Sequence, residues 1–366
     1  MKKKLNIAII GSRGYPYVYS GYETLVKELS ERLVKKGNKV RVYCHRSLFK
    51  NRPKYLNDIE LIYTPSIETK ILSQFINSFF SFIHACFSKV DVIFVVNTAN
   101  GPFGLFTKLF RKKTCINVDG LEWLRPKWKG FGSYYFIVAS KLSILFFDEV
   151  VTDSYEMNKI YLEKFNKKST VIAYGSTMVK NSKTNFLNLN NIKKNSYYLI
   201  VGRLIPDNNS LLIINGFLKS NSKKKLVIVG DVPYVDEYSN EIKSIINNRI
   251  ILLGYVKDQK ILSELYHNSY AYIHGHEFGG TNPTMINAID LNCSIIALNT
   301  KFNLEMLDKQ KFLLFEKNEE SISNVLNEFE LIDKKIKASQ SNMISERFNW
   351  NSIVNQYQSL FQKLLD

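Results

Sequence analysis

The sequence predicts an α/β protein in which two doubly wound, Rossmann-like parallel-sheet domains face each other across a cleft. Three observations lead to this prediction. The chain of 366 residues is long for a single hydrophobic core. Short apolar runs alternate with helical stretches in two successive series, which is typical of parallel sheets covered by helices. A polar segment, residues 180–195, separates the two series.

The first series begins with an apolar strand at Leu5–Ile10, followed by an amphipathic helix at Gly21–Lys36. The run Asp91–Val96 has no polar face, as expected for a strand that is buried on both sides. The remaining strands of this series are expected at Val40–Cys44, Thr114–Val118, Glu149–Thr152 and Val171–Ile172. These elements define an N-terminal domain over residues 1–179.

The second series follows residues 180–195, whose Asn, Ser and Lys content predicts a linker. Its strands are expected at Tyr197–Val201, Lys225–Val229, Ile250–Leu253, Tyr270–Ile273 and Ser294–Leu298. They define a C-terminal domain over residues 196–346. Residues 347–366 contain a last helix, Trp350–Leu364. This helix is expected to pack on either the C-terminal domain or, by folding back, the N-terminal domain.

The net charge is +17, from 50 Lys and Arg against 33 Asp and Glu. Such an excess fits a solvated basic surface, an anionic substrate or an anionic membrane. Nucleic acid is disfavoured, because the chain has no zinc-finger spacing, RNA-recognition signature or basic heptad region. The four widely spaced cysteines and the short N-terminal apolar run favour a cytoplasmic protein without a signal peptide.

Residues 71–87 are strongly apolar but are interrupted by Gln74, Asn77, Ser78 and His84. The run is shorter than the ~20 apolar residues that a membrane span needs. A basic cluster follows at residues 107–113. Two interpretations stay open: peripheral contact with an anionic membrane, or a core-facing helix beside a solvated charged segment.

The segment after Tyr270–Ile273 predicts an anion site. The chain leaves this strand, turns at Gly279-Gly280 and enters a helix that Thr281 or Asn282 caps, with Pro283 in its first turn. Backbone N–H groups and the positive end of the helix dipole would then point at one spot, which suits a phosphate.

Glu277 and two histidines stand beside this turn. His274 and His276 are two positions apart, and no third ligand follows at a recognisable spacing, so we expect no metal site.

Two further strand exits carry candidate ligands. The loop after the first strand contains Gly11, Arg13 and Gly14 but departs from the dinucleotide-binding pattern, so nicotinamide or flavin binding is disfavoured. Its glycines still allow close approach of a ligand, and its arginine can reach a phosphate or sugar, unless the loop is only a tight turn. Gly202 and Arg203 follow the first strand of the second series, where an arginine can pair bidentately with a diphosphate.

The loop over residues 117–128 mixes acids, tryptophans and basic groups. Asp119, Glu122, Trp123, Arg125 and Trp128 offer carboxylates for sugar hydroxyls and aromatic faces for stacking. Asp119, nearest the strand end, is best placed for the cleft. The alternative is a tryptophan that packs in the core beneath a solvated loop.

Five motifs in order resemble one enzyme family over essentially the whole chain. They are Gly11-Ser-Arg-Gly-Tyr-Pro16, Ser20-Gly-Tyr-Glu-Thr24, Asn117-Val-Asp-Gly-Leu-Glu-Trp123, Val201-Gly-Arg-Leu-Ile-Pro-Asp-Asn-Asn209 and His274-Gly-His-Glu-Phe-Gly-Gly-Thr-Asn-Pro283. The chain is similar to the retaining glycosyltransferases of the GT-B type in family 4. Within that family it resembles a subgroup that includes bacterial rhamnosyltransferases of capsule and polysaccharide assembly.

The resemblance implies transfer of a hexose, L-rhamnose from dTDP-L-rhamnose, to a lipid-linked saccharide at the inner face of the cell membrane, without a metal or other cofactor. The residues it implies in catalysis are Arg203, Asp119 and Glu277. The donor site would comprise Gly11, Arg13, Gly14, Gly202, Asn208, Gly279, Gly280, Thr281, Asn282 and Asn287. The acceptor site would comprise Glu23, Glu122, Trp123, Arg125 and Trp128.

Two positions depart from the family pattern. The family has two glutamates around its glycine turn at a shorter spacing, whereas here Glu277 and Asn287 are ten positions apart and the second is an amide. The family often has a lysine where this chain has Asn208, so neutralisation of the diphosphate depends more on Arg203. Either the pocket suits a deoxy-sugar nucleotide, which we favour, or activity is reduced. A nucleotide-sugar epimerase and a non-catalytic sugar-nucleotide-binding subunit are the other two function classes.

Overall fold

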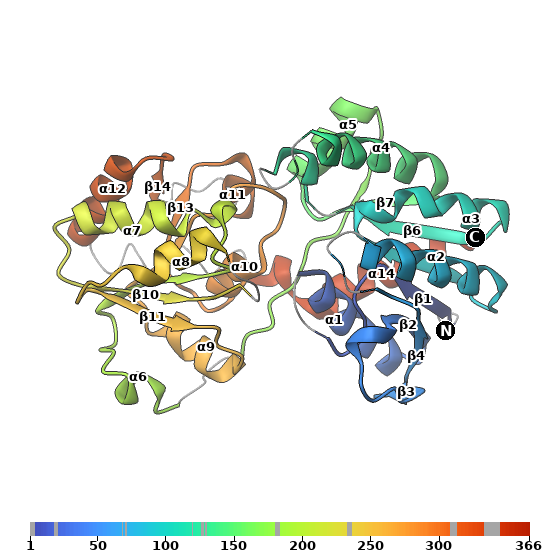
Figure 1. Cartoon of the computed structure of the whole chain (residues 1–366), viewed down its shortest axis with the longest axis horizontal. Helices are drawn as coiled ribbons and strands as arrows, with labels where there is room; N and C mark the ends of the chain where they lie inside the picture. Colours follow the sequence, from blue (N-terminus) through green and yellow to red (C-terminus); the bar gives the residue numbers. More distant parts are fainter. Residues whose placement is uncertain are drawn as a thin grey trace. The chain divides into compact units, whose positions relative to one another are not determined.

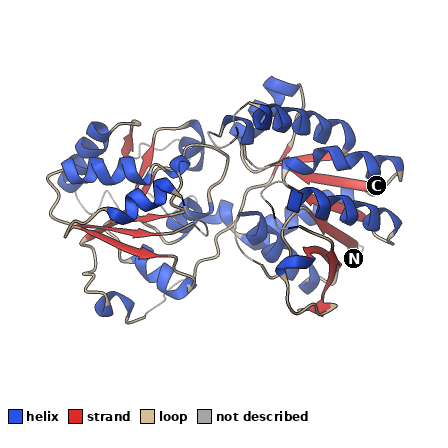
Figure 2. Ribbon diagram, viewed as in Figure 1, coloured by secondary structure: helices blue, strands red, loops and turns tan. Residues whose placement is uncertain are grey.

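The computed structural model describes residues 4–17, 21–67, 69, 72–118, 120–125, 128, 130–179, 184–232, 236–307, 313–332 and 345–366. The chain forms two compact units (Figure 1), one of Met1–Tyr174 with Trp350–Asp366 and one of Gly175–Asn349. Each is a parallel sheet with helices on both faces (Figure 2), which confirms the predicted pair of doubly wound domains.

The sheet of the N-terminal unit has the strand order β3-β4-β2-β1-β5-β6-β7-β8 and is parallel except at the β3–β4 edge. Its strands are β1 (Asn6–Ile10), β2 (Lys39–His45), β3 (Tyr55–Leu56), β4 (Ile59–Thr64), β5 (Val92–Val96), β6 (Lys113–Asn117), β7 (Glu149–Thr152) and β8 (Thr170–Val171). Its helices are α1 (Gly21–Lys35), α2 (Leu72–Phe87), α3 (Gly104–Leu109), α4 (Phe131–Phe146), α5 (Tyr155–Phe165) and α14 (Trp350–Lys363). Short 3₁₀ turns are η1 (Arg46–Leu48), η2 (Thr98–Phe103) and η3 (Glu122–Leu124).

The direction of each crossover decides which face of this sheet a helix covers. The connection from β1 to β2 runs one way along the sheet, and those through α2, α3, α4 and α5 run the other way. Because such crossovers are right-handed, α1 covers one face and α2 to α5 cover the other. The C-terminal helix α14 packs beside α1, and its Tyr357 hydroxyl accepts a hydrogen bond from Asn117 Nδ2 at 3.2 Å.

The sheet of the C-terminal unit has the order β11-β10-β9-β12-β13-β14 and is parallel throughout. Its strands are β9 (Tyr197–Val201), β10 (Lys225–Val229), β11 (Ile250–Gly254), β12 (Ala271–His274), β13 (Ile295–Leu298) and β14 (Leu313–Phe315). Its helices are α6 (Phe186–Leu189), α7 (Ser210–Lys219), α8 (Glu237–Ser244), α9 (Gln259–His267), α10 (Pro283–Asp290), α11 (Lys301–Met306) and α12 (Glu319–Leu331). The 3₁₀ turns are η4 (Pro206–Asn208) and η5 (Ser345–Phe348).

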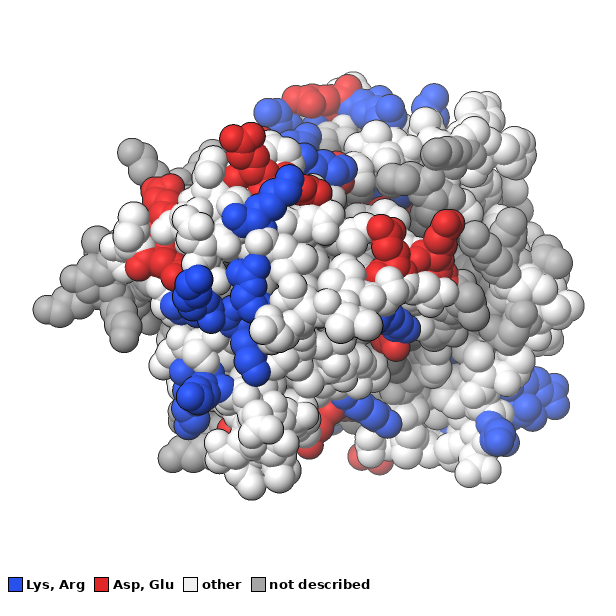
Figure 3. Space-filling model, turned by 60° about the vertical axis from the view of Figure 1, so that its left-hand side comes forward, with Lys and Arg blue, Asp and Glu red and all other residues white. Residues whose placement is uncertain are grey.

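The polar segment predicted as a linker contains α6, and two of its apolar side chains, Leu187 and Ile192, are buried. All four cysteines are buried as free thiols. Within the described ranges, no helix combines the length and the apolar character that crossing a bilayer requires. Basic and acidic side chains are interspersed over the face that Figure 3 shows.

Candidate functional site

The strand order of the C-terminal unit reverses between β9 and β12. From β9 the chain continues to β10 on one side, and from β12 it continues to β13 on the other. The loops that leave the carboxyl ends of these two strands therefore lead to helices on opposite faces of the sheet. In open α/β sheets, ligands bind at such a switch point.

Gly275 lets the two loops of this switch point touch. A Cβ at this position would lie 2.4 Å from the backbone oxygen of Asn208 and 2.7 Å from Ile213 Cδ1. Asn209, in the left-handed conformation at φ 52°, donates from Nδ2 to the Gly275 oxygen at 2.8 Å. Only a glycine fits this close approach, so the backbone of one loop is fixed against the other.

Further hydrogen bonds join the same two loops. Asn208 donates from Nδ2 to the Arg203 oxygen at 2.7 Å, and its Oδ1 lies 2.7 Å from His276 Nδ1. The backbone N–H of Glu277 donates to the Asp207 oxygen at 3.1 Å. Asn208 thus connects the loop of Arg203 with that of the predicted phosphate turn.

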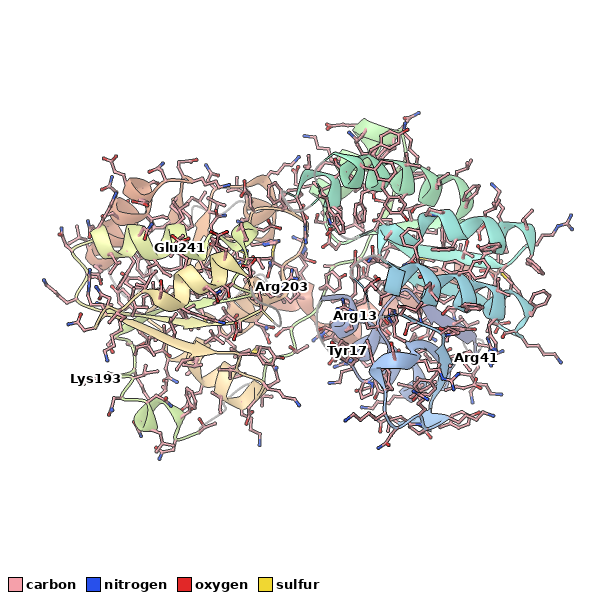
Figure 4. All side chains as sticks on the ribbon, in the orientation of Figure 1. Arg13, Tyr17, Arg41, Lys193, Arg203 and Glu241 are labelled. Atoms are coloured by element: carbon pink, nitrogen blue, oxygen red, sulfur yellow. The ribbon has the colours of Figure 1, made fainter. Side chains whose placement is uncertain are left out.

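Arg203 differs from the two other arginines of this unit in what its guanidinium contacts. Arg249 donates to the backbone oxygens of Leu218 and Ser222, each at 2.9 Å, and Arg347 pairs with Glu305 at 2.7 Å. No carboxylate among the described residues forms an ion pair with Arg203. The side chain is half-buried and lies on the loop that leaves β9 (Figure 4). Of the three arginines of this unit, it is the one best placed to receive an anion.

The turn before α10 has the predicted cap. Pro283, at the first helical position, has no N–H, and Thr284 N donates to Asn282 Oδ1 at 3.0 Å. Asn282, one of the two predicted N-caps, therefore satisfies one of the helix donors itself. Gly279, at φ +108°, and Gly280 form the preceding turn, and Thr281 is buried after it. An anion here would meet the helix dipole and the turn amides.

A buried polar chain holds the cap in place. The Tyr272 hydroxyl lies 2.9 Å from both His274 Nδ1 and Thr284 Oγ1, and Thr284 Oγ1 donates to Asn282 Oδ1 at 2.8 Å. Burial lowers the pKa of His274 to about 3, so the imidazole is neutral at physiological pH. His274 is therefore a structural residue of the cap.

The depressed pKa of His274 predicts a loss of stability in acid. The unfolded chain takes up a proton near pH 6.5, whereas the folded chain does so only near pH 3. Unfolding is therefore favoured as the pH falls from 6.5 towards 3. Between pH 6.5 and 5.0 we expect His274 to remove about 2 kcal/mol of unfolding free energy. Urea unfolding of the wild type and His274→Gln at both pH values measures it. If the unfolding free energy changed equally with pH in the two proteins, this prediction would be contradicted.

Glu277 has a partner that the sequence did not reveal. Its Oε2 accepts from Lys317 Nζ at 2.6 Å. Lys317 follows β14, a strand of three residues that was not predicted, so no sequence signal placed this lysine at the site. Asn303, also not predicted, donates from Nδ2 to the oxygens of His276 and Leu298 at 3.2 and 2.9 Å.

Asn287 is buried within α10 and its oxygen contacts the protein itself. Asn287 Oδ1 accepts from Ser176 Oγ at 3.3 Å and from Thr177 N at 3.4 Å. A carboxylate oxygen could accept the same two bonds but could not donate. The amide leaves its NH₂ group as a donor.

The N-terminal unit has its own switch point between β1 and β5. Gly11, at φ +104°, passes so close to β5 that a Cβ would lie 2.2 Å from the Val96 oxygen. Gly14, at φ +121°, has the Cys44 sulfur 2.7 Å from a Cβ position. Glu23 is buried, and its Oε1 accepts from the backbone N–H of Arg13 at 3.1 Å. The loop is thereby held rigid, with Arg13 on it (Figure 4).

The loop after β6 separates into two groups of residues. Glu122 Oε1 pairs with Arg125 at 3.1 Å, and its Oε2 accepts from Trp128 Nε1 at 2.7 Å. Trp123 lies in an aromatic cluster with Tyr161 and Phe165 and is 8% exposed. It therefore packs in the core, which was the alternative to a sugar-binding tryptophan. Asp119, which was expected in the cleft, lies outside the described residues.

Comparison with known proteins gives two family matches. Residues 4–177 match a domain of unknown function, DUF1972, and residues 182–346 match the glycosyl transferases group 1. No curated protein sequence matches the chain.

Solved structures match over nearly the whole length. Sucrose-phosphate synthase from Thermosynechococcus elongatus has a TM-score of 0.81 at 16% identity and covers 99% of each chain. HepE from Anabaena, in complex with UDP, has a TM-score of 0.78 at 14% identity and covers 98% of this chain and 100% of its own. A glycosyltransferase from Rickettsia africae has a TM-score of 0.74 at 18% identity and covers 100% of both chains. The group 1 match, over the unit that carries Arg203 and the Gly279 turn, and this shared fold identify the chain as a glycosyltransferase of the GT-B fold.

Proposed function

We propose that the chain transfers L-rhamnose from dTDP-L-rhamnose to a lipid-linked saccharide, with retention of configuration, at the cytoplasmic face of the membrane. The observation that carries the donor part is Arg203, a half-buried guanidinium at the switch point with no carboxylate paired to it among the described residues. A nucleotide sugar also suits the fold, because HepE, which shares it, has been solved with UDP-glucose.

In the proposed reaction, the guanidinium of Arg203 and the amides of Gly279 and Gly280 hold the donor diphosphate. The acceptor hydroxyl oxygen bonds to the anomeric carbon as the bond from that carbon to the phosphate oxygen breaks. The hydroxyl proton passes to the departing diphosphate. Charge grows on that diphosphate in the transition state, where fixed donors stabilise it most. The reaction therefore needs no divalent metal.

Two further residues act on the sugar and nucleoside in this proposal. Glu277, held by Lys317, accepts hydrogen bonds from hydroxyls of the transferred sugar. Asn287 donates its NH₂ to the ribose of the nucleotide, while its oxygen stays bonded to Ser176 and Thr177. A neutral amide at this position suits the deoxyribose of a dTDP donor, which has one hydroxyl fewer to bind.

A thermal-shift screen over dTDP-, UDP- and GDP-sugars, in buffer containing EDTA, tests the donor. At a ligand concentration 100 times Kd, dTDP-L-rhamnose should stabilise the protein by about 2.7 kcal/mol. The shift should persist in EDTA, because no metal takes part in binding. If a UDP-sugar raised the melting temperature more than dTDP-L-rhamnose does, the UDP-sugar would be the better candidate donor. If EDTA abolished the thermal shift, donor binding would depend on a metal and the metal-free site would be refuted. Conversion of the donor to an epimer without acceptor would contradict transfer itself.

A further inference from the structure

Helix α2 buries polar side chains together with Phe82, Ala85 and Cys86, and it exposes three large aromatic ones. The buried polar residues are Ser73, Asn77, Ser78 and Ser81. The exposed aromatic residues are Phe79, Phe80 and Phe87, which are 41%, 44% and 75% exposed.

The buried polar side chains of α2 bond to β4 and to the turn η2. Asn77 Nδ2 donates to Thr64 Oγ1 at 2.7 Å, and Ser81 Oγ lies 2.9 Å from the same hydroxyl. Ser78 donates to Asn100 Oδ1 at 2.6 Å. These bonds and the buried Phe82 anchor α2 to the unit. The exposed phenylalanines take no part in this anchoring.

The exposed apolar surface continues onto the neighbouring helices. Phe79 contacts Phe106 of α3, and Phe87 contacts Phe110 after it, with ring centroids 5.7 and 4.9 Å apart. Lys108 of α3 donates to the Leu145 oxygen of α4 at 2.8 Å. We define the apolar face of α2, α3 and α4 as Phe79, Phe80, Phe87, Leu105, Leu109, Phe110 and Leu145, all of which are at least 41% exposed.

Exposed apolar side chains are concentrated on these three helices and are not spread evenly over the protein. Of the nineteen exposed large apolar side chains among the described residues, nine lie on α2, α3 and α4 or on the residue directly after α3. Exposed apolar residues in the C-terminal unit, such as Ile246 and Leu331, come from separate elements. A contiguous patch of this kind marks an interaction surface.

Bases outnumber acids around the apolar face, where Asp148, which follows α4, is an exposed acid near Leu145. Helices α2, α3 and α4 contain no Asp or Glu. Exposed bases border the face at Lys108, Arg111, Lys113 and Lys141. The Lys108 ammonium also lies 6.0 Å from the Phe146 ring, so this side chain lies against α4 and covers apolar surface there. Elsewhere, as on the face in Figure 3, both signs are mixed.

We propose that the apolar face of α2, α3 and α4 inserts into the headgroup region of an anionic bilayer. Phenylalanine and leucine side chains would enter the acyl boundary, and the bordering bases would pair with anionic headgroups. The proposal deepens the proposed function, because a lipid-linked acceptor is reached at a bilayer surface. The occupant is a lipid surface, because seven apolar side chains bordered mainly by cations complement its apolar interior and its anionic headgroups.

Co-sedimentation of the full chain with vesicles tests the proposal. We expect binding to phosphatidylcholine vesicles that contain phosphatidylglycerol, and weaker binding in high salt or without the anionic lipid. Phe87→Ser with Leu109→Ser removes the two most exposed members of the apolar face. Each of these two substitutions should weaken partitioning of the protein onto the vesicles about tenfold. Arg111→Gln with Lys141→Gln should weaken it about fivefold per residue, and only at low salt.

The matched control is Ile246→Ser with Leu331→Ser, which removes two exposed apolar side chains from the other unit. Binding unchanged in that control, with wild-type thermal unfolding in every variant, supports the proposal. Equal loss in control and test variants, or binding to neutral vesicles alone, overturns it. Concentration-dependent dimerisation that the Phe87→Ser, Leu109→Ser variant abolishes, without vesicle binding, would assign the face to a second copy instead. The thermal shift with dTDP-L-rhamnose is measured in parallel, so failure of vesicle binding is separable from failure of the proposed function.

Discussion

Arg203→Ala is expected to lower the rate of sugar transfer by about 10²–10³, because it removes a fixed charged donor from the leaving diphosphate. The guanidinium has no carboxylate partner among the described residues, so its removal leaves no buried acid uncompensated. The fold should therefore survive, and the loss should be catalytic. Steady-state release of the nucleoside diphosphate, with saturating acceptor, measures the effect.

Two companion variants sharpen this result. Arg203→Lys keeps the charge but loses the bidentate fork, so its rate should lie between those of the wild type and Arg203→Ala. Lys193→Ala removes an exposed cation of the same unit (Figure 4) and should retain the wild-type rate. Near wild-type turnover of Arg203→Ala would remove this residue from the donor site.

Gly275→Ala is expected to reduce both stability and donor affinity. The added methyl carbon would lie 2.4 Å from the Asn208 oxygen, and that atom belongs to backbone that cannot rotate away. The loops of the switch point must then separate, at a cost of about 1–3 kcal/mol in unfolding free energy. The hydrogen bond from Asn209 to Gly275 would break, and Arg203 would shift relative to the phosphate turn. Urea unfolding and donor titration on the same preparation measure the two effects.

Gly254→Asn is the matched control for that steric argument. Gly254 ends β11 at φ +65°, and a Cβ there would meet no heavy atom within 4 Å. Asparagine adopts this left-handed conformation readily, so we expect a small change in stability and unaltered donor affinity. If Gly275→Ala changes stability and donor affinity as little as this control does, close contact of the two loops does not determine the geometry of the site.

The sequence predicted those strands best whose apolar runs are continuous and bounded by polar residues. The ranges expected at Tyr197–Val201 and Lys225–Val229 match β9 and β10 to the residue. Strand β4 was not predicted because Glu60 interrupts its apolar pattern, and β14 because it has only three residues. Both need the tertiary pairing with their neighbours to be recognised.

The candidate site could be proposed from the sequence where neighbouring residues are the signal. Gly202 and Arg203 come directly after β9, and the Gly279-Gly280 turn begins five residues after the end of β12. The contacts that hold these groups join positions far apart along the chain. The pairs Asn208–His276 and Glu277–Lys317 arise only when β9, β12 and β14 lie in one sheet. No local pattern encodes them.

A crystal structure of the full chain with dTDP bound tests the central claim most directly. We predict that a phosphoryl oxygen lies within hydrogen-bond distance of the Arg203 guanidinium and of the amides of the Gly279-Gly280 turn. The thymidine ribose should lie beside α10, where Asn287 donates its NH₂ group. A diphosphate that contacts neither Arg203 nor this turn would contradict the donor site described for this glycosyltransferase.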